Sequence, residues 1–295
     1  MDWESKFKLW GQSPSRTEQE KMENAESAVK NAIEASETLN RHNIRVFPQG
    51  SYRNRTNVKQ DSDVDICVLC TDTFYFHLPN GTTRDQFGLN DPPVYHDAEY
   101  RRDVENALVS YFGSQAVTAG NKAWDIHQNT YRVNADVVAC FEYRYYYSDG
   151  SYQTGTAVLP RSGFYIVNFP EQNYLNSKQK NDDTSRRFRV GVRIMKNLCN
   201  EMYVNGDASS KNIPSYFLEC LIWNVPNEGF NRESYLADIR WILAHLCNET
   251  RQDEMCKDWC EINGFKYLFH SSQRWNRVQA NSFLNAAWRY IGFKD

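Results

Sequence analysis

The chain has 295 residues, of which 41% are hydrophobic and 24% are charged, and its formal net charge is −3. This composition is typical of a globular protein with a sizeable core in one or two domains, and it excludes long disorder. The slight negative charge argues against a general nucleic-acid binder, which is normally strongly basic. The N-terminus is not a signal peptide, and no apolar run approaches the ~20 residues of a membrane span, so a cytoplasmic protein is expected.

The first half of the chain predicts a mixed arrangement of helices and strands. Apolar residues spaced by three and four predict a long helix that begins between Ser13 and Ser15. Alternating apolar residues and turn residues predict the elements that follow it. These are strands at 44–49 and 63–70, a helix at 97–113, short strands within 115–147, and a turn at 148–151 before a returning strand.

Acidic residues stand at the start of the second strand, in the stretch QDSDVDI. Asp61, Asp63 and Asp65 are two residues apart, so in an extended chain their side chains point the same way. Such a patch is repulsive unless cations neutralise it, and carboxylate oxygens suit hard divalent ions such as Mg²⁺ and Mn²⁺. Asp136 begins a later apolar strand and supplies a third carboxylate if the two strands are neighbours.

A glycine-serine pair, Gly50 and Ser51, lies between the first strand and these acids. A turn of this kind can present backbone N–H groups and a hydroxyl to a phosphate. The pair alone is a weak signal. Together with the Asp-hydrophobic-Asp pattern and the third acid, it favours a nucleotide site over the alternative that the acids only end strands at the solvent.

From about residue 184 the pattern predicts only helices, at 184–202, 214–224, 232–248 and 279–293. The polar segment 170–183 predicts the boundary between two lobes. The expected division is 1–175 and 176–295, with the long N-terminal helix spanning both.

The helix predicted at 184–202 carries a basic stripe. Arg186, Arg189, Arg193 and Lys196 fall on one side of it, opposite a set of apolar residues. Such a stripe is either a solvated face or a surface that binds an anion. The apolar set comprises Val190, Ile194, Met195 and Leu198.

Eight cysteines are present, and most lie inside apolar helix or strand patterns, as is typical of buried thiols in a reducing compartment. A C-terminal cluster of cysteines and histidines could be imagined around zinc. Its CKDWC spacing does not match the usual pairs of cysteines two residues apart, so a zinc site is not expected. The cluster comprises His245, Cys247, Cys256, Cys260 and His270.

The stretch GSYRNRTNVKQDSDVDI, with the later ADVV, resembles the polymerase-β-type nucleotidyltransferase superfamily. YIVNFPEQ, RIMKN and IPSYFLECLIWNVP extend the resemblance, over residues 46–226, to the bacterial cGAS/DncV-like nucleotidyltransferases, most closely the CdnE-like clade. This implies an α+β fold: a polymerase-β-like lobe with a mixed sheet and an OAS-like C-terminal helical lobe, with the active site in the cleft between them. It also implies an enzyme that joins and cyclises NTPs into signalling molecules that activate an antiphage effector.

The resemblance assigns roles in the first lobe. Asp63, Asp65 and Asp136 hold two Mg²⁺ ions, with Mn²⁺ as a possible substitute. Asp61 falls outside the motif, as an auxiliary charge or a turn former. The implied triphosphate contacts are Gly50 and Ser51, and Gln49 is an implied nucleotide-binding residue beside them.

In the helical lobe, Lys196 and Ser215 stand where the family contacts phosphate, and Tyr216 stands where an aromatic ring stacks on the base. Tyr216 could otherwise belong to the helix core. Asn168 stands where CdnE-like sequences place a base-reading residue, and asparagine there goes with pyrimidine use. Its amide can pair with the N3–H and O4 edge of uracil, although the alternative is that it only stabilises the turn before Pro170.

The implied substrates are NTPs, with UTP favoured, and the implied product is a uridine-containing cyclic dinucleotide; neither an extended nucleic acid nor a membrane is an expected partner. Two other functions stay open. An acceptor-modifying nucleotidyltransferase of the tRNA, poly(A) or antitoxin type would need a basic groove, which the mild acidity argues against. An inactive nucleotide-binding module would not need three intact acids.

Overall fold

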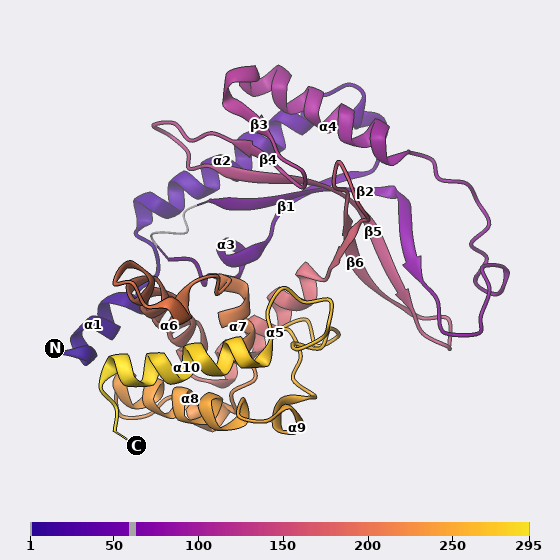
Figure 1. The fold of residues 1–295 in the computed structure, drawn as a ribbon. Coiled ribbons are helices and arrows are strands. Elements are labelled where there is room, and N and C mark those ends of the chain that lie inside the picture. The colour runs from indigo at the N-terminus through magenta and orange to yellow at the C-terminus, as the bar shows by residue number, and fades with distance from the viewer. Residues whose placement is uncertain (1, 59–62, 295) are drawn as a thin grey trace. The chain divides into compact units, whose positions relative to one another are not determined.

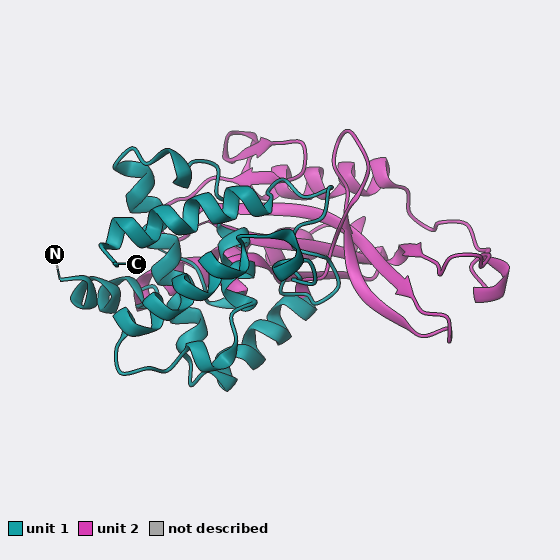
Figure 2. Ribbon diagram, turned by 60° about the horizontal axis from the view of Figure 1, so that its bottom comes forward, with its two compact units in different colours: residues 1–14, 54–61, 171–295 teal, residues 15–53, 62–170 magenta. Residues whose placement is uncertain are grey.

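The computed structural model describes residues 2–58 and 63–294, which form two compact units (Figures 1 and 2). Unit 1 comprises residues 1–14, 54–61 and 171–295, and unit 2 comprises residues 15–53 and 62–170. Unit 1 is helical, whereas unit 2 combines a mixed sheet with helices, so the predicted α+β class is confirmed. The chain passes from unit 2 to unit 1 after Pro170, five residues before the expected boundary.

In its described residues, unit 2 contains one seven-stranded sheet with the order β1-β2-β5-β4-β3, in which β6 pairs with β5 and β7 pairs with β6. β2 and β5 are parallel, and the other pairs are antiparallel. The strands are β1 Ile44–Pro48, β2 Val64–His77, β3 Val117–Ala119, β4 Trp124–Ile126, β5 Ala135–Tyr146, β6 Tyr152–Val158 and β7 Ile166–Asn168. The helices are α2 Arg16–Glu34, α3 Gly50–Asn54 and α4 Asp97–Phe112, with short 3₁₀ turns at Leu39–Arg41, Asp85–Phe87 and Ser114–Ala116.

Alternation along β5 gives the sheet two different faces. Val137 and Phe141 belong to a buried cluster that includes side chains of α2 and α4. Val138 and Cys140 point the other way, into a smaller apolar cluster with residues of β2 and β6. Because side chains alternate, Asp136 shares this second face, away from α2 and α4.

The long helix predicted from Ser13–Ser15 forms as α2, and a separate helix, α1, which the sequence pattern did not predict, precedes it. α1, Trp3–Trp10, belongs to unit 1, and α2 begins at Arg16 in unit 2, the expected starting point. A capping box sets that start: the Ser15 hydroxyl accepts from the Glu18 N–H at 3.3 Å, and the Glu18 carboxylate accepts from the Ser15 N–H at 2.7 Å. The helix therefore does not span both units.

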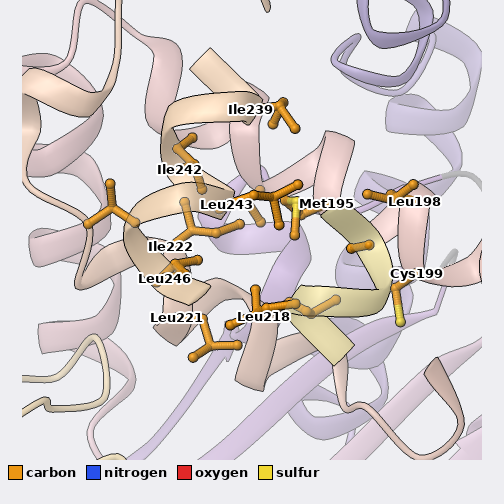
Figure 3. Close-up of a cluster of buried hydrophobic side chains, with 14 of the residues drawn as sticks. Met195, Leu198, Cys199, Leu218, Leu221, Ile222, Ile239, Ile242, Leu243 and Leu246 are labelled. Atoms are coloured by element: carbon orange, nitrogen blue, oxygen red, sulfur yellow. The ribbon is translucent and has the colours of Figure 1, made fainter. Parts of the chain in front are cut away.

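Unit 1 is a bundle of helices around one apolar core. Side chains from three of its helices point toward one another there, among them Met195, Leu218, Ile222 and Leu243 (Figure 3). The helices are α5 Pro170–Asp183, α6 Arg187–Val204, α7 Ser215–Trp223, α8 Tyr235–Glu249, α9 Asp253–Cys256 and α10 Arg277–Ile291, with 3₁₀ turns at Ala208–Ser210 and Asn227–Gly229.

The polar segment expected to be the boundary is helix α5. One of its polar side chains takes part in the packing of unit 1, since Lys180 Nζ donates to the Val225 carbonyl at 2.6 Å. Burial lowers the pKa of Lys180 to about 8. Tertiary contacts of this kind stabilise the helix α5, although the polar composition of the segment does not predict a helix.

The cysteines are thiols, as expected. Seven of the eight are buried, Cys260 is half-buried, and none forms a disulfide. Among the helices of the described residues, none has the length and apolar character needed to cross a membrane.

Candidate active site

Three aspartates stand in a row across neighbouring strands of unit 2. The parallel pairing of β2 with β5 places Asp65 opposite Asp136, and the antiparallel pairing of β4 with β5 places Asp125 opposite Asp136. Neighbouring strands lie about 4.8 Å apart, so the three share one face of the sheet. Asp63 precedes Asp65 by two residues and is exposed. The strands that carry the predicted acids are therefore neighbours, as expected, and Asp125 is an acid that the sequence reading missed.

The electrostatics of this row centre on Asp136. Burial raises the pKa of its carboxyl group, and the negative charges of Asp63 and Asp125 raise it further. Ionisation of Asp136 is therefore less favourable than that of a solvent-exposed aspartate. A cation placed among these carboxylates would remove that penalty.

Asn134 supports the exposed acid and was also missed by sequence reasoning. Its side-chain amide donates to Asp63 Oδ1 at 3.2 Å, and its side-chain oxygen accepts from the Gln128 N–H at 2.7 Å. Its carbonyl accepts from the Val64 N–H at 3.1 Å. The sequence could have indicated this role, because Asn134 directly precedes β5 and lies two residues before Asp136.

The donor set fits divalent cations in chemistry, because it consists of carboxylate oxygens that repel one another. Among the residues that the structure describes, however, no three His, Cys, Asp or Glu side chains are arranged to hold one ion. Backbone pairing thus brings the acids together, while their carboxylates do not converge on a single point. Asp61 lies outside the described residues.

Gly50 lies directly against the acids. It has a left-handed conformation, with φ of +65°, and a Cβ at this position would overlap Asp65 Oδ2. The neighbouring Gln49 N–H donates to the Asp65 carbonyl at 2.8 Å, which ties the turn to the start of β2. Ser51 is the second residue of α3 and is half-buried. Glycine is thus required here by its backbone conformation and by the approach of Asp65.

Asn168 lies on the same face of the sheet as Asp136. It ends β7 opposite Thr156 of β6, and Thr156 in turn lies opposite Glu142 of β5. Glu142 and Asp136 are six residues apart on one strand, so their side chains share a face, and cross-strand pairing extends that face to Asn168. The pairing of β5, β6 and β7 therefore places Asn168, the predicted base reader, on the same face of the sheet as Asp136.

The basic stripe of α6 is largely buried within unit 1. Arg193 is 5% exposed and donates to the carbonyls of Gly11, at 2.9 Å, and Arg55, at 2.7 Å. Burial lowers the pKa of Arg193 to about 10. Arg189 is half-buried, and its Nε and Nη2 have no hydrogen-bond partner among the described residues. A solvated face is therefore wrong for Arg193, whereas Arg186 precedes the helix and is exposed.

Lys196, the predicted triphosphate contact, is also buried. It is 1% exposed, and its Nζ lies 2.8 Å from Oε1 of Glu219, which is 3% exposed. Apart from this ion pair, neither Lys196 Nζ nor Glu219 Oε2 has a hydrogen-bond partner among the described residues. The Lys196 ammonium group is thus paired with the Glu219 carboxylate in the interior of unit 1.

Ser215 and Tyr216 begin α7. The Tyr216 hydroxyl lies 3.1 Å from both Asn173 Oδ1 and Glu261 Oε2, and its ring meets Trp275 edge-on at 6.4 Å. Burial raises the pKa of Tyr216. The ring therefore packs at the margin of the unit 1 core, and its stacking on a base stays a prediction.

The buried pair makes a sharp prediction about stability. Lys196→Met would leave Glu219 charged and unpaired in the core, which is expected to cost about 3–5 kcal/mol of unfolding free energy. Lys196→Met combined with Glu219→Leu removes both charges and is expected to recover most of this loss. Urea unfolding checks both. If the double variant is stable and binds NTPs normally, the triphosphate contact of Lys196 is wrong; a stable double variant with weakened binding supports it.

Comparisons with known proteins identify the family to which the chain is similar. Residues 175–292 match the model of the cGAS/DncV-like nucleotidyltransferase C-terminal helical domain. The chain is 43% identical to the cyclic dipyrimidine nucleotide synthase CdnE of Legionella pneumophila, over 99% of this chain and 98% of the relative. It is 39% identical to the synthase of the same name from Cecembia lonarensis, over 98% of each. The structure of the Rhodothermus marinus CdnE c-UMP-AMP synthase with Apcpp and Upnpp superposes with a TM-score of 0.85 and 28% identity, covering 99% of this chain and 98% of that one.

Proposed function

Because the chain belongs to the cGAS/DncV-like nucleotidyltransferases and is a CdnE-like enzyme that makes cyclic dinucleotides, we propose that UTP is a preferred substrate and that the product contains uridine. The observation that carries this proposal is the position of Asn168 on the acid-bearing face of the sheet. Relatives named for dipyrimidine and UMP-AMP products support it. The product would act on a downstream effector in antiphage defence.

The reaction is a nucleotidyl transfer carried out twice. A ribose hydroxyl of one nucleotide attacks the α-phosphate of another and pyrophosphate leaves; a second transfer closes the ring. Asp63, Asp65 and Asp136 would hold two Mg²⁺ ions, or Mn²⁺ in their place, which would supply charge neutralisation for the attacking and leaving oxygens. The protein's own work is mainly positioning, which accounts for much of the rate gain in such transfers.

Each remaining residue has a positioning role in this proposal. The turn of Gln49, Gly50 and Ser51 holds the triphosphate beside the acids, since its backbone is tied to the first residues of β2. Ser215 is a proposed phosphate contact, whereas Lys196 could contact phosphate only if its buried ion pair with Glu219 opened. Tyr216 stacks on a base, which is sequence-tolerant because every base has a π-face.

Asn168 supplies the base discrimination. Its side-chain oxygen accepts the uracil N3–H while its amide N–H donates to uracil O4; guanine offers the same donor and acceptor at N1–H and O6, but its larger ring system places that edge elsewhere relative to the ribose. The residue is half-buried at the end of β7, where water competes less for these groups than on an open surface.

The test supplies ATP, GTP, CTP and UTP in equal amounts and identifies the products by mass. Wild type is expected to incorporate uridine, and Asn168→Ser is expected to change the preferred base by about tenfold or more, because a lost bidentate contact costs ~1–3 kcal/mol. Asn80→Ser, in an exposed turn of the same unit, is the matched control. A wild-type product made only of purines, or an unaltered base ratio in Asn168→Ser, would contradict the proposal.

The same incubation separates the two other functions. An acceptor-modifying nucleotidyltransferase would need added RNA or protein for incorporation, whereas a cyclic dinucleotide synthase forms phosphatase-resistant products without one. An inactive binding module would release no pyrophosphate under either condition.

A further inference from the structure

Thr156 lies directly opposite the proposed base reader, and its hydroxyl is unusual. The antiparallel pairing of β6 and β7 sets Thr156 against Asn168. Opposed residues in such a pair have Cβ atoms about 4.5–5.5 Å apart, within reach of a side-chain hydrogen bond. Thr156 is only 2% exposed, and its Oγ1 has no hydrogen-bond partner among the residues that the structure describes.

The neighbour on the other side of Thr156 is already engaged. Glu142 of β5 lies opposite Thr156, but its carboxylate accepts from Arg144 Nε at 2.5 Å. On the side of Thr156 away from Glu142, the polar cross-strand neighbour of its hydroxyl is the side-chain amide of Asn168. Buried hydroxyls are almost always hydrogen-bonded, so an unsatisfied one calls for a partner.

Close packing fixes the backbone at the same place. A Cβ on Gly155 would lie 2.6 Å from the Asn168 carbonyl oxygen and 2.9 Å from the Phe169 ring, so only glycine lets β7 approach β6 this closely. The remaining freedom of Asn168 is rotation of its side chain. That rotation decides where the amide oxygen and nitrogen lie, and hence which base edge they can pair with.

We propose that Thr156 is a positioning residue for base selection: its buried hydroxyl, unbonded within the described part of the chain, hydrogen-bonds the Asn168 amide once that amide rotates into the orientation that pairs with uracil. Pairing with uracil uses one lone pair of the amide oxygen and one amide hydrogen. The second lone pair and the second hydrogen stay available, and the Thr156 hydroxyl can donate to the former or accept from the latter. Because Oγ1 is inaccessible to solvent, it acts through Asn168 and not on the nucleotide itself.

This inference rests on the proposed function, and the test uses two substitutions of opposite character. Thr156→Val keeps the shape and removes the hydroxyl, whereas Thr156→Ser keeps the hydroxyl and removes a buried methyl group. The readouts are kcat and KM for UTP and ATP, the product ratio from equal NTPs, and the melting temperature. Thr156→Val is expected to lower the preference for UTP roughly three- to tenfold, the effect of one hydrogen bond, mainly through a higher KM for UTP.

The two variants should separate positioning from packing. Thr156→Ser should melt earlier than wild type but keep its base preference, whereas Thr156→Val should melt no earlier than wild type and lose preference. In an Asn168→Ala background, Thr156→Val should have no further effect on base ratio. A normal base ratio in Thr156→Val, or an additive effect in the double variant, would overturn this inference while leaving the role of Asn168 intact. If the wild type showed no base preference and Asn168→Ser had the same base ratio, both the role of Asn168 and that of Thr156 would be wrong.

Discussion

Asp136→Asn is expected to lower turnover by roughly a thousandfold or more, because losing a carboxylate from the shared row removes several kcal/mol of charge stabilisation in the transition state. Asp65→Asn should behave alike, since Asp65 lies opposite Asp136. Pyrophosphate release measures the effect. Asp149→Asn, at an exposed hairpin turn of the same unit, is the control and should keep wild-type turnover. Near-normal turnover in Asp136→Asn would refute the catalytic assignment.

The fold should survive this change, with a pH dependence of defined sign. The pKa of Asp136 is raised in the folded protein by burial and by Asp63 and Asp125. A carboxyl group with a raised pKa opposes folding when ionised and stops doing so once protonated. With divalent ions chelated, Asp136→Asn should therefore melt at or above the wild-type temperature at pH 7. That difference should shrink as the pH falls toward the unperturbed value of 3.8. A much lower melting temperature at pH 7 would mean a structural role instead.

Gly50→Ala should also abolish most activity, by roughly a hundredfold, although it changes no charge. The new Cβ would overlap Asp65 Oδ2, so the carboxylate or the turn must move. Displacements of about 1 Å in such a site cost about that much in rate. The left-handed backbone adds a stability loss of about 1–2 kcal/mol. Pyrophosphate release and thermal melting, measured together, check both effects.

Gly150→Ala provides a matched comparison for that variant. Gly150 also has a left-handed φ, of +85°, but nothing lies within 4 Å of the position its Cβ would take. The two variants should lose similar stability, and only Gly50→Ala should lose turnover. If Gly150→Ala loses as much activity, general destabilisation explains the result, and the contact with Asp65 does not matter.

Local pattern predicted two of the three aspartates in the row, Asp65 and Asp136, but not Asp125. The two-residue spacing of Asp63 and Asp65 fixes a common face, and an apolar strand that starts with Asp136 is a natural neighbour in a mixed sheet. Asp125 was missed because β4 is only three residues long, so its alternation of buried and half-buried side chains is too short to identify a strand from the sequence. Its place beside Asp136 follows from strand pairing, which a single sequence does not encode locally.

The helical residues were harder to predict for a different reason. The spacing of Arg193 and Lys196 gives a basic stripe whether that side of the helix faces water or protein. Only the packing of α6 against α1 and α7 decides between them, through Gly11 and Glu219. Thr156 gave no signal at all, because its importance comes from its register with Asn168.

The placement of α1 in the helical unit has a consequence for how the chain is made. α1 buries Phe7 in the core of that unit, and its Glu4 carboxylate accepts from the Leu236 N–H at 2.8 Å. On the ribosome, the described strands of unit 2 are all complete once residue 168 has emerged, whereas the core residues of unit 1 that surround Phe7 begin at residue 188 and the backbone partner of Glu4 is residue 236. The first helix to be translated is therefore among the last to be buried, and during that interval its aromatic face is open to chaperones.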